Sequence, residues 1–151
     1  DIYEVRDQKV KYAKAVLTGA SKQAAIEAAE LEKDATLYRC HFEFPASLSL
    51  YINDKQIDAI KDGMTYNSLQ VQYDSLVDMV PSLTEEEKKQ IYAWYKEARE
   101  FSMDAENSDK KHAAFNKYKG RINNYLTKRG YDLVKERNEW YKRLKAAGKK
   151  I

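Results

Sequence analysis

Apolar residues recur at intervals of three and four along most of the chain, which is the spacing of one face of an α-helix. The pattern is clearest over residues 66–80, 91–101 and 115–126. Alternation of apolar and polar residues, which indicates a strand, does not persist over a strand length. The sequence therefore predicts an all-α fold, a single helical bundle of about five or six main antiparallel helices over residues 1–151.

Glycines and prolines mark the expected helix ends. Gly19, Gly63 and Gly130 are expected to stop helices, and Pro45 and Pro81 to end or kink them. Few Gly and Pro occur otherwise, 5 and 2 in the whole chain, which favours long helices over a fold with many tight turns.

The strongest local motif is Thr84 followed by three glutamates. The Thr84 side chain can accept from the amide of Glu87 while the Glu87 carboxylate accepts from the amide of Thr84, which is a capping box at a helix start. The helix behind this motif is expected to bury Ile91, Trp94, Tyr95, Ala98 and Phe101.

A second pattern lies nearer the N-terminus. Six apolar residues follow one another at alternating steps of four and three: Ala24, Ala28, Leu31, Ala35, Tyr38 and Phe42. Such a narrow seam is typical of a helix that packs along another helix. We therefore expect a partner helix along residues 24–42.

The C-terminal end of the chain is strongly basic, unlike the rest of the chain. Residues 107–151 carry 14 Lys and Arg against 4 Asp and Glu, a net +10, whereas the first 106 residues carry 13 against 20, a net −7. On the helix expected from about residue 108 to 129, the side chains of Lys117, Arg121, Asn124 and Lys128 fall on one face. This face is either an anion-binding ridge or the solvated side of an amphipathic helix.

Two further residues are candidates beside this ridge. Tyr131 follows the end of the same helix, and His112 lies on the edge of its apolar stripe. A groove lined by Arg121, Tyr131 and His112 would favour an enzyme. Arg137 lies in register with apolar residues of the last helix and is expected to be partly buried and paired.

Catalytic and metal-binding motifs do not emerge. The two histidines lie far apart without metal-ligand spacing, so we expect no metal and no cofactor. Asp58 and Asp62 form an i,i+4 carboxylate pair that could bind a divalent cation or act as acid and base, or could be surface acids. The single Cys40 excludes an internal disulfide.

Several motifs together resemble an uncharacterised family of proteins secreted by Bacteroidetes, family 3826 of the domains of unknown function. They are residues 61–66 (KDGMTY), 78–88 (DMVPSLTEEEK), 96–100 (KEARE), 111–112 (KH) and 115–126 (FNKYKGRINNYL), running on to 130–133 (GYDL). Ala114 and Asn116 stand where the family is expected to carry Trp and Gly. The resemblance implies export and a frequent setting among polysaccharide-degradation genes, without an established activity.

Localisation and partners follow from these observations as expectations. The chain opens at Asp1 without Met and is expected to lack an N-terminal signal or leader segment. Because the resemblance implies export, we expect a periplasmic, secreted or outer-membrane-associated protein. No apolar run is long enough to span a bilayer. Moderate net charge and expected export argue against nucleic acid as the partner.

The leading hypothesis is an exported, non-catalytic accessory protein for glycan utilisation. It would bind an acidic saccharide, or an outer-membrane or periplasmic partner protein, through the basic and aromatic face. One alternative is an ATP-independent periplasmic chaperone or structural partner, because the Thr84 helix start is also similar to helix starts of periplasmic helical chaperones. The other alternative is an enzyme that acts on acidic glycans.

Overall fold

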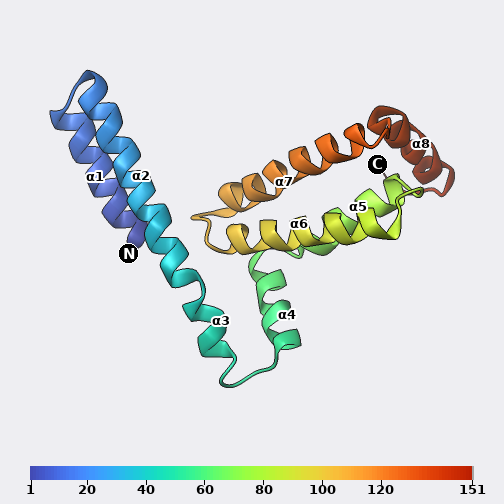
Figure 1. The fold of residues 1–151 in the computed structure, drawn as a ribbon, viewed down its shortest axis with the longest axis horizontal. Coiled ribbons are helices and arrows are strands. Elements are labelled where there is room, and N and C mark those ends of the chain that lie inside the picture. The colour runs from blue at the N-terminus through green and yellow to red at the C-terminus, as the bar shows by residue number, and fades with distance from the viewer. Residues whose placement is uncertain (151) are drawn as a thin grey trace. The chain divides into compact units, whose positions relative to one another are not determined.

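The computed structural model describes residues 1–150, and their regular structure is entirely helical (Figure 1). This confirms the all-α prediction. The elements are α1 (Ile2–Val16), α2 (Gly19–His41), α3 (Glu43–Leu48), α4 (Asp54–Met64), α5 (Ser68–Met79), α6 (Glu85–Met103), α7 (Ser108–Lys128) and α8 (Leu133–Ala146).

The chain forms two compact units, Asp1–Ile57 and Asp58–Ile151. The first holds α1, α2 and α3, and the second holds most of α4 together with α5 to α8. The single all-α domain expected for residues 1–151 stays a prediction.

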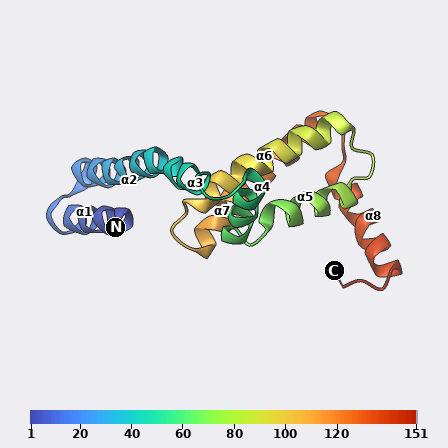
Figure 2. The same ribbon diagram turned by 90° about the horizontal axis from the view of Figure 1, so that it is seen from below.

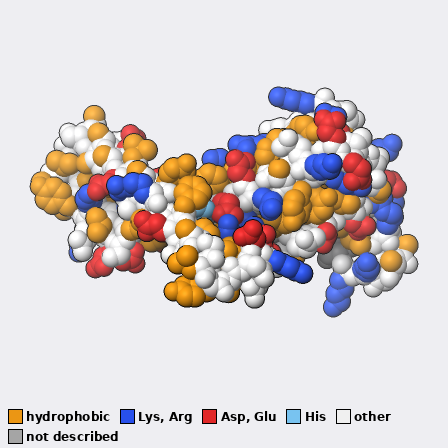
Figure 3. All heavy atoms as spheres, turned by 60° about the horizontal axis from the view of Figure 1, so that its bottom comes forward, with side chains coloured by type: hydrophobic (Ala, Val, Ile, Leu, Met, Phe, Trp, Pro, Cys, Tyr) orange, Lys and Arg blue, Asp and Glu red, His pale blue; other side chains and the backbone are white. Residues whose placement is uncertain are grey.

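The first unit is built on a hairpin of α1 and α2, which lie side by side in two views (Figures 1 and 2). Ala13 and Ala29 are buried where the two helices meet, so small side chains allow a close approach. Ion pairs between Arg6 and Glu30 and between Lys9 and Glu32 join the same two helices. Large apolar side chains remain exposed on this hairpin, and Figure 3 shows hydrophobic side chains on its surface.

The second unit has a larger core, formed where α6 packs against both α5 and α7. Its buried residues keep the three- and four-residue spacing of each helix: Leu69, Leu76, Val80, Leu83, Ile91, Tyr95, Ala98, Phe115, Tyr118, Ile122 and Leu126. Helix α8 packs on α5 and α7 through half-buried residues such as Leu133. The apolar stripes expected on α5, α6 and α7 therefore do form the core, apart from Phe101 at the end of the α6 stripe.

The capping box is present as expected. The Thr84 hydroxyl accepts from the Glu87 amide at 3.2 Å, and the Glu87 carboxylate accepts from the Thr84 amide at 2.9 Å. Gly130 has the positive φ, +94°, expected of a residue that ends a helix.

Three local expectations are wrong. Gly19 does not stop a helix, because α1 ends at Val16 and Gly19 is the first residue of α2. Helix α4 continues through Gly63 to Met64, and the chain reverses only at Tyr66 and Asn67, whose φ values are +57° and +54°. Phe101 is 56% exposed, because it lies on the outer side of α6, next to the exposed face of α7.

Candidate binding surface on helices α6 and α7

The predicted ridge lies on the outer face of α7. Lys117, Arg121, Asn124 and Lys128 are all exposed, while Tyr118 and Ile122 of the same helix are buried against the core. The interior of α7 is held by these buried residues, and Asn107 caps its first turn by accepting from the Lys110 amide at 3.0 Å. The ridge is therefore presented by a helix whose orientation is fixed.

Two of the ridge residues border a shallow depression between α6 and α7. Its volume is about 360 Å³, and it is lined by residues from both helices: Glu97, Phe101, Ala114, Lys117, Tyr118 and Arg121. Because position 114 carries only a methyl group, the rings of Phe101 and Tyr118 can border open space. The depression brings together aromatic, cationic and acidic groups from segments about twenty residues apart.

Aromatic contacts organise the depression. The rings of Phe101 and Tyr118 stack, with centroids 6.3 Å apart and planes 28° apart. The guanidinium carbon of Arg121 lies 4.7 Å from the Tyr118 ring centroid, which is a cation–π contact. These contacts restrain both the Phe101 ring and the Arg121 side chain before any ligand binds.

The Arg121 guanidinium also faces Glu97, whose Oε2 accepts from Nη1 at 3.4 Å. Both side chains are about half exposed, 48% and 52%, so this ion pair is weak and water reaches both charges. Burial raises the pKa of the Tyr118 hydroxyl, and the neighbouring Glu97 carboxylate raises it further. Tyr118 therefore stays protonated at neutral pH.

This arrangement suits a ring-shaped, anionic ligand. Phe101 offers an apolar face, Arg121 offers a planar pair of donors for a carboxylate or sulfate, and Lys117 offers a second positive charge. Asn124 and Lys128 extend the polar surface along α7 by a further two turns.

The hydroxyl of Tyr131 forms hydrogen bonds with residues outside the depression. It donates to Glu87 Oε2 at 2.6 Å and lies 3.3 Å from the Ser82 carbonyl oxygen. Arg129 Nε donates to the other oxygen of the same carboxylate at 2.6 Å. Burial would raise the pKa of Glu87, but the hydrogen bonds from Tyr131, Thr84 and Arg129 outweigh it and lower the pKa to about 2. Tyr131 thus fixes the connection between α7 and α8 through a buried carboxylate.

His112 lies at the opposite end of α7. Sixteen residues of helix separate it from Lys128, a distance of about 24 Å at the usual rise per residue. Its ring stacks on Tyr66, with centroids 5.5 Å apart, and Lys111 Nζ donates to the Met64 carbonyl at 2.8 Å. The structure therefore does not form the groove of Arg121, Tyr131 and His112 that would have favoured an enzyme.

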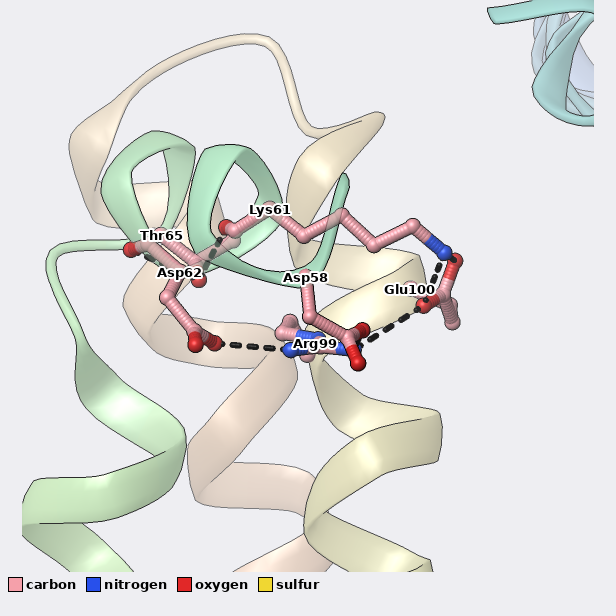
Figure 4. A network of polar contacts seen from close by, with 6 residues as sticks. All are labelled: Asp58, Lys61, Asp62, Thr65, Arg99 and Glu100. Carbon is pink, nitrogen blue, oxygen red and sulfur yellow. Dashed lines mark hydrogen bonds and ion pairs between the residues drawn. The ribbon is translucent and has the colours of Figure 1, made fainter. Parts of the chain in front are cut away.

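A network that the sequence did not reveal surrounds Arg99, which is only 3% exposed (Figure 4). Nη1 donates to Asp62 at 2.8 Å and Nη2 to Asp58 at 2.5 Å, so the i,i+4 carboxylates of α4 hold one guanidinium of α6. Lys61 donates to Glu100 at 2.8 Å beside them. The network joins α4 to α6. Because Asp58 and Asp62 both pair with Arg99, the interpretations of these two carboxylates as a cation site or as an acid–base pair lose their support.

The burial expected for Arg137 is wrong. Arg137 is exposed, because α8 packs on its neighbours through half-buried residues and leaves most of its surface in solvent. The buried arginine is Arg99, whose partners lie 37 and 41 residues away in sequence. The one sequence signal that included Arg99 was the family motif at residues 96–100 (KEARE).

Within residues 1–150, no group of three or more His, Cys, Asp or Glu side chains is arranged to hold a metal ion. None of the helices over the same residues is both long and apolar enough to cross a membrane.

Residues 1–146 match a protein family described as a protein of unknown function, DUF3826. The chain belongs to the DUF3826 family. The DUF3826 match spans α1 to α8, including the first fifty residues, which lie outside the motifs named above. No curated protein matches the chain.

Proposed function

We propose that this protein is an exported, non-catalytic accessory protein of glycan utilisation, and that it binds an acidic saccharide in the depression between α6 and α7. The observation that carries the proposal is the position of Phe101. A ring that is 56% exposed stands beside Arg121 and Lys117 and is restrained by stacking on Tyr118. Sugar rings pack on such aromatic faces, and their carboxylates or sulfates pair with guanidinium groups.

Electrostatics support an acidic ligand over a neutral one. The α7 side of the depression belongs to residues 107–151, which carry a net +10. The carboxylate of Glu97 already occupies one side of Arg121 at 3.4 Å. A ligand anion would replace this long and solvated contact, so Glu97 competes with the ligand for the guanidinium.

Export and a role in glycan utilisation rest on the resemblance to secreted Bacteroidetes proteins encoded among polysaccharide-degradation genes. The proposal treats the protein as a binding protein because the residues lining the depression offer an aromatic face and charged groups of both signs. Fractionation of the native host, with detection by antibody, tests export separately from binding.

Binding is tested by calorimetric titration with an oligogalacturonate and with a neutral oligosaccharide of equal length. Arg121→Ala should weaken oligogalacturonate binding about tenfold to a hundredfold, as loss of a bidentate charged contact does. Glu97→Gln should strengthen binding, because it removes the competing carboxylate. Phe101→Ala should weaken binding of the same ligand without changing its dependence on salt concentration.

Arg137→Ala is the matched control, since Arg137 is an exposed arginine of α8 outside the depression. Its binding should equal that of the wild type. Equal affinity for acidic and neutral saccharides, or equal losses for Arg121→Ala and Arg137→Ala, would exclude the depression as the site.

A further inference from the structure

Helix α2 carries apolar residues on two opposite faces. One face, which includes the buried Ala29, packs on α1. The other is the seam of Ala24, Ala28, Leu31, Ala35, Tyr38 and Phe42, and all six of its residues are exposed. At about 100° per residue these six fall within an arc of roughly 80°, centred about 140° from Ala29.

The partner helix expected for this seam is therefore not α1. The three large residues of the seam, Leu31, Tyr38 and Phe42, are 69%, 67% and 60% exposed. Tyr38 and Phe42 contact each other edge to face, with ring centroids 5.9 Å apart, so both rings stand on the same side of the helix. Within the first unit, an apolar stripe of about 27 Å along one helix thus remains uncovered.

The seam is also symmetric under reversal of its direction. Its steps are four, three, four, three and four, which read the same from either end. When one copy is laid antiparallel on another, each large residue meets an alanine. Phe42 meets Ala24, Tyr38 meets Ala28, and Leu31 meets Ala35, each pair occurring twice about a two-fold axis.

We propose that this face of α2 binds the α2 helix of a second copy of the chain, antiparallel and about a two-fold axis near Lys33. A two-fold interface uses the same surface on both subunits, so a self-complementary pattern is what it requires. Pairing a large side chain with an alanine at every level allows two helices to interdigitate at a constant separation. A different partner protein would not require each large residue of the seam to lie as far from its middle as an alanine on the other side.

Charges beside the axis are compatible with this pairing. Glu32 and Asp34 flank the centre of the seam and would approach their own symmetry mates. Each already has a lysine partner within its own chain, Lys9 at 2.5 Å from Glu32 and Lys33 at 3.0 Å from Asp34. These lysines reduce the repulsion between the two copies.

The test is sedimentation equilibrium of the full chain over a range of concentrations, with two single variants and their combination. Tyr38→Ala leaves alanine against alanine, and Ala28→Tyr places tyrosine against tyrosine. Each change occurs twice per dimer, so a tenfold loss per site weakens dimerisation about a hundredfold. The double variant Ala28→Tyr/Tyr38→Ala restores one large and one small residue at every level and should recover most of the wild-type affinity.

Tyr51→Ala is the control, because Tyr51 is 86% exposed and lies outside the seam. It should dimerise like the wild type, and circular dichroism should show unchanged helix content in all variants. A wild-type chain that stays monomeric at its highest soluble concentration overturns the proposal. So does a stronger dimer in Ala28→Tyr alone, since a parallel pair would place position 28 against itself and gain contact there.

Discussion

Glu87 offers the most informative single substitution for stability, because three donors converge on one carboxylate that is 2% exposed. Its oxygens accept from the Thr84 amide at 2.9 Å, from the Tyr131 hydroxyl at 2.6 Å and from Arg129 Nε at 2.6 Å. Glu87→Gln keeps the shape and the capping bond but removes the negative charge. It thereby isolates the contribution of the charged hydrogen bonds.

The size of the effect follows from the pKa of Glu87, which falls from 4.5 to about 2. Each pKa unit corresponds to about 1.4 kcal/mol, so the ceiling is about 3.4 kcal/mol. Glutamine retains part of the hydrogen bonding, so we expect Glu87→Gln to lower the free energy of unfolding by about 2–3 kcal/mol at neutral pH.

The sign with pH is also defined. Because folding lowers the pKa of Glu87, its stabilisation is fully present above the unfolded pKa and is lost as the pH falls through the folded pKa. The gap between wild type and Glu87→Gln should therefore be widest above about pH 5 and should close toward about pH 2. Urea unfolding followed by circular dichroism at several pH values measures this gap.

Glu85→Gln is the matched control, since Glu85 lies in the same first turn but is exposed and contacts Lys88 on the surface. It should unfold like the wild type. A gap for Glu87→Gln that does not change between neutral and acid pH would refute the reasoning, because the loss would then not come from the charge.

Two further predictions concern backbone conformation and the Arg99 network. Gly120 lies within α7 with open space around it, so Gly120→Ala should raise the free energy of unfolding by about 0.5–1 kcal/mol. Gly130 has a φ of +94°, so Gly130→Ala should lower the free energy of unfolding by about 1–2 kcal/mol. Equal effects of the two substitutions in urea unfolding would contradict the assigned conformations. Asp58→Asn/Asp62→Asn should cost about 3–5 kcal/mol, because it leaves the buried Arg99 guanidinium with the 3.8 Å contact to Glu100 as its remaining ion pair. Arg99→Met should cost less, because the two aspartates are partly exposed and can be solvated. Thermal unfolding gives the order, and a reversed order would show that the carboxylates matter for another reason.

The features best predicted from the sequence are those that depend on residues close together in the chain. The capping box at Thr84 depends on residues three apart, and the structure contains both of its hydrogen bonds. The stripes of α5, α6 and α7 also follow from local spacing, because a residue repeated at three and four faces one side of its helix. The exposure of the α7 ridge follows from the same periodicity.

Sequence failed where a contact joins distant segments. Arg99 and Arg137 each lie near apolar residues of a helix, yet only Arg99 faces carboxylates, and those belong to α4. Periodicity could not place Phe101 at the edge of a depression, because that depends on how α6 and α7 pack. His112 and Tyr131 are close to one helix in sequence, but the length of α7 separates them.

The measurement that tests the central claim most directly is a map of amide chemical shifts during titration with an oligogalacturonate. The account predicts that the largest changes fall on residues 97–101 of α6 and 114–121 of α7, that they saturate together, and that Arg121→Ala removes them while Arg137→Ala does not. Changes spread evenly over lysine-rich surfaces, or centred on Tyr66 and His112, would contradict a saccharide site in this depression.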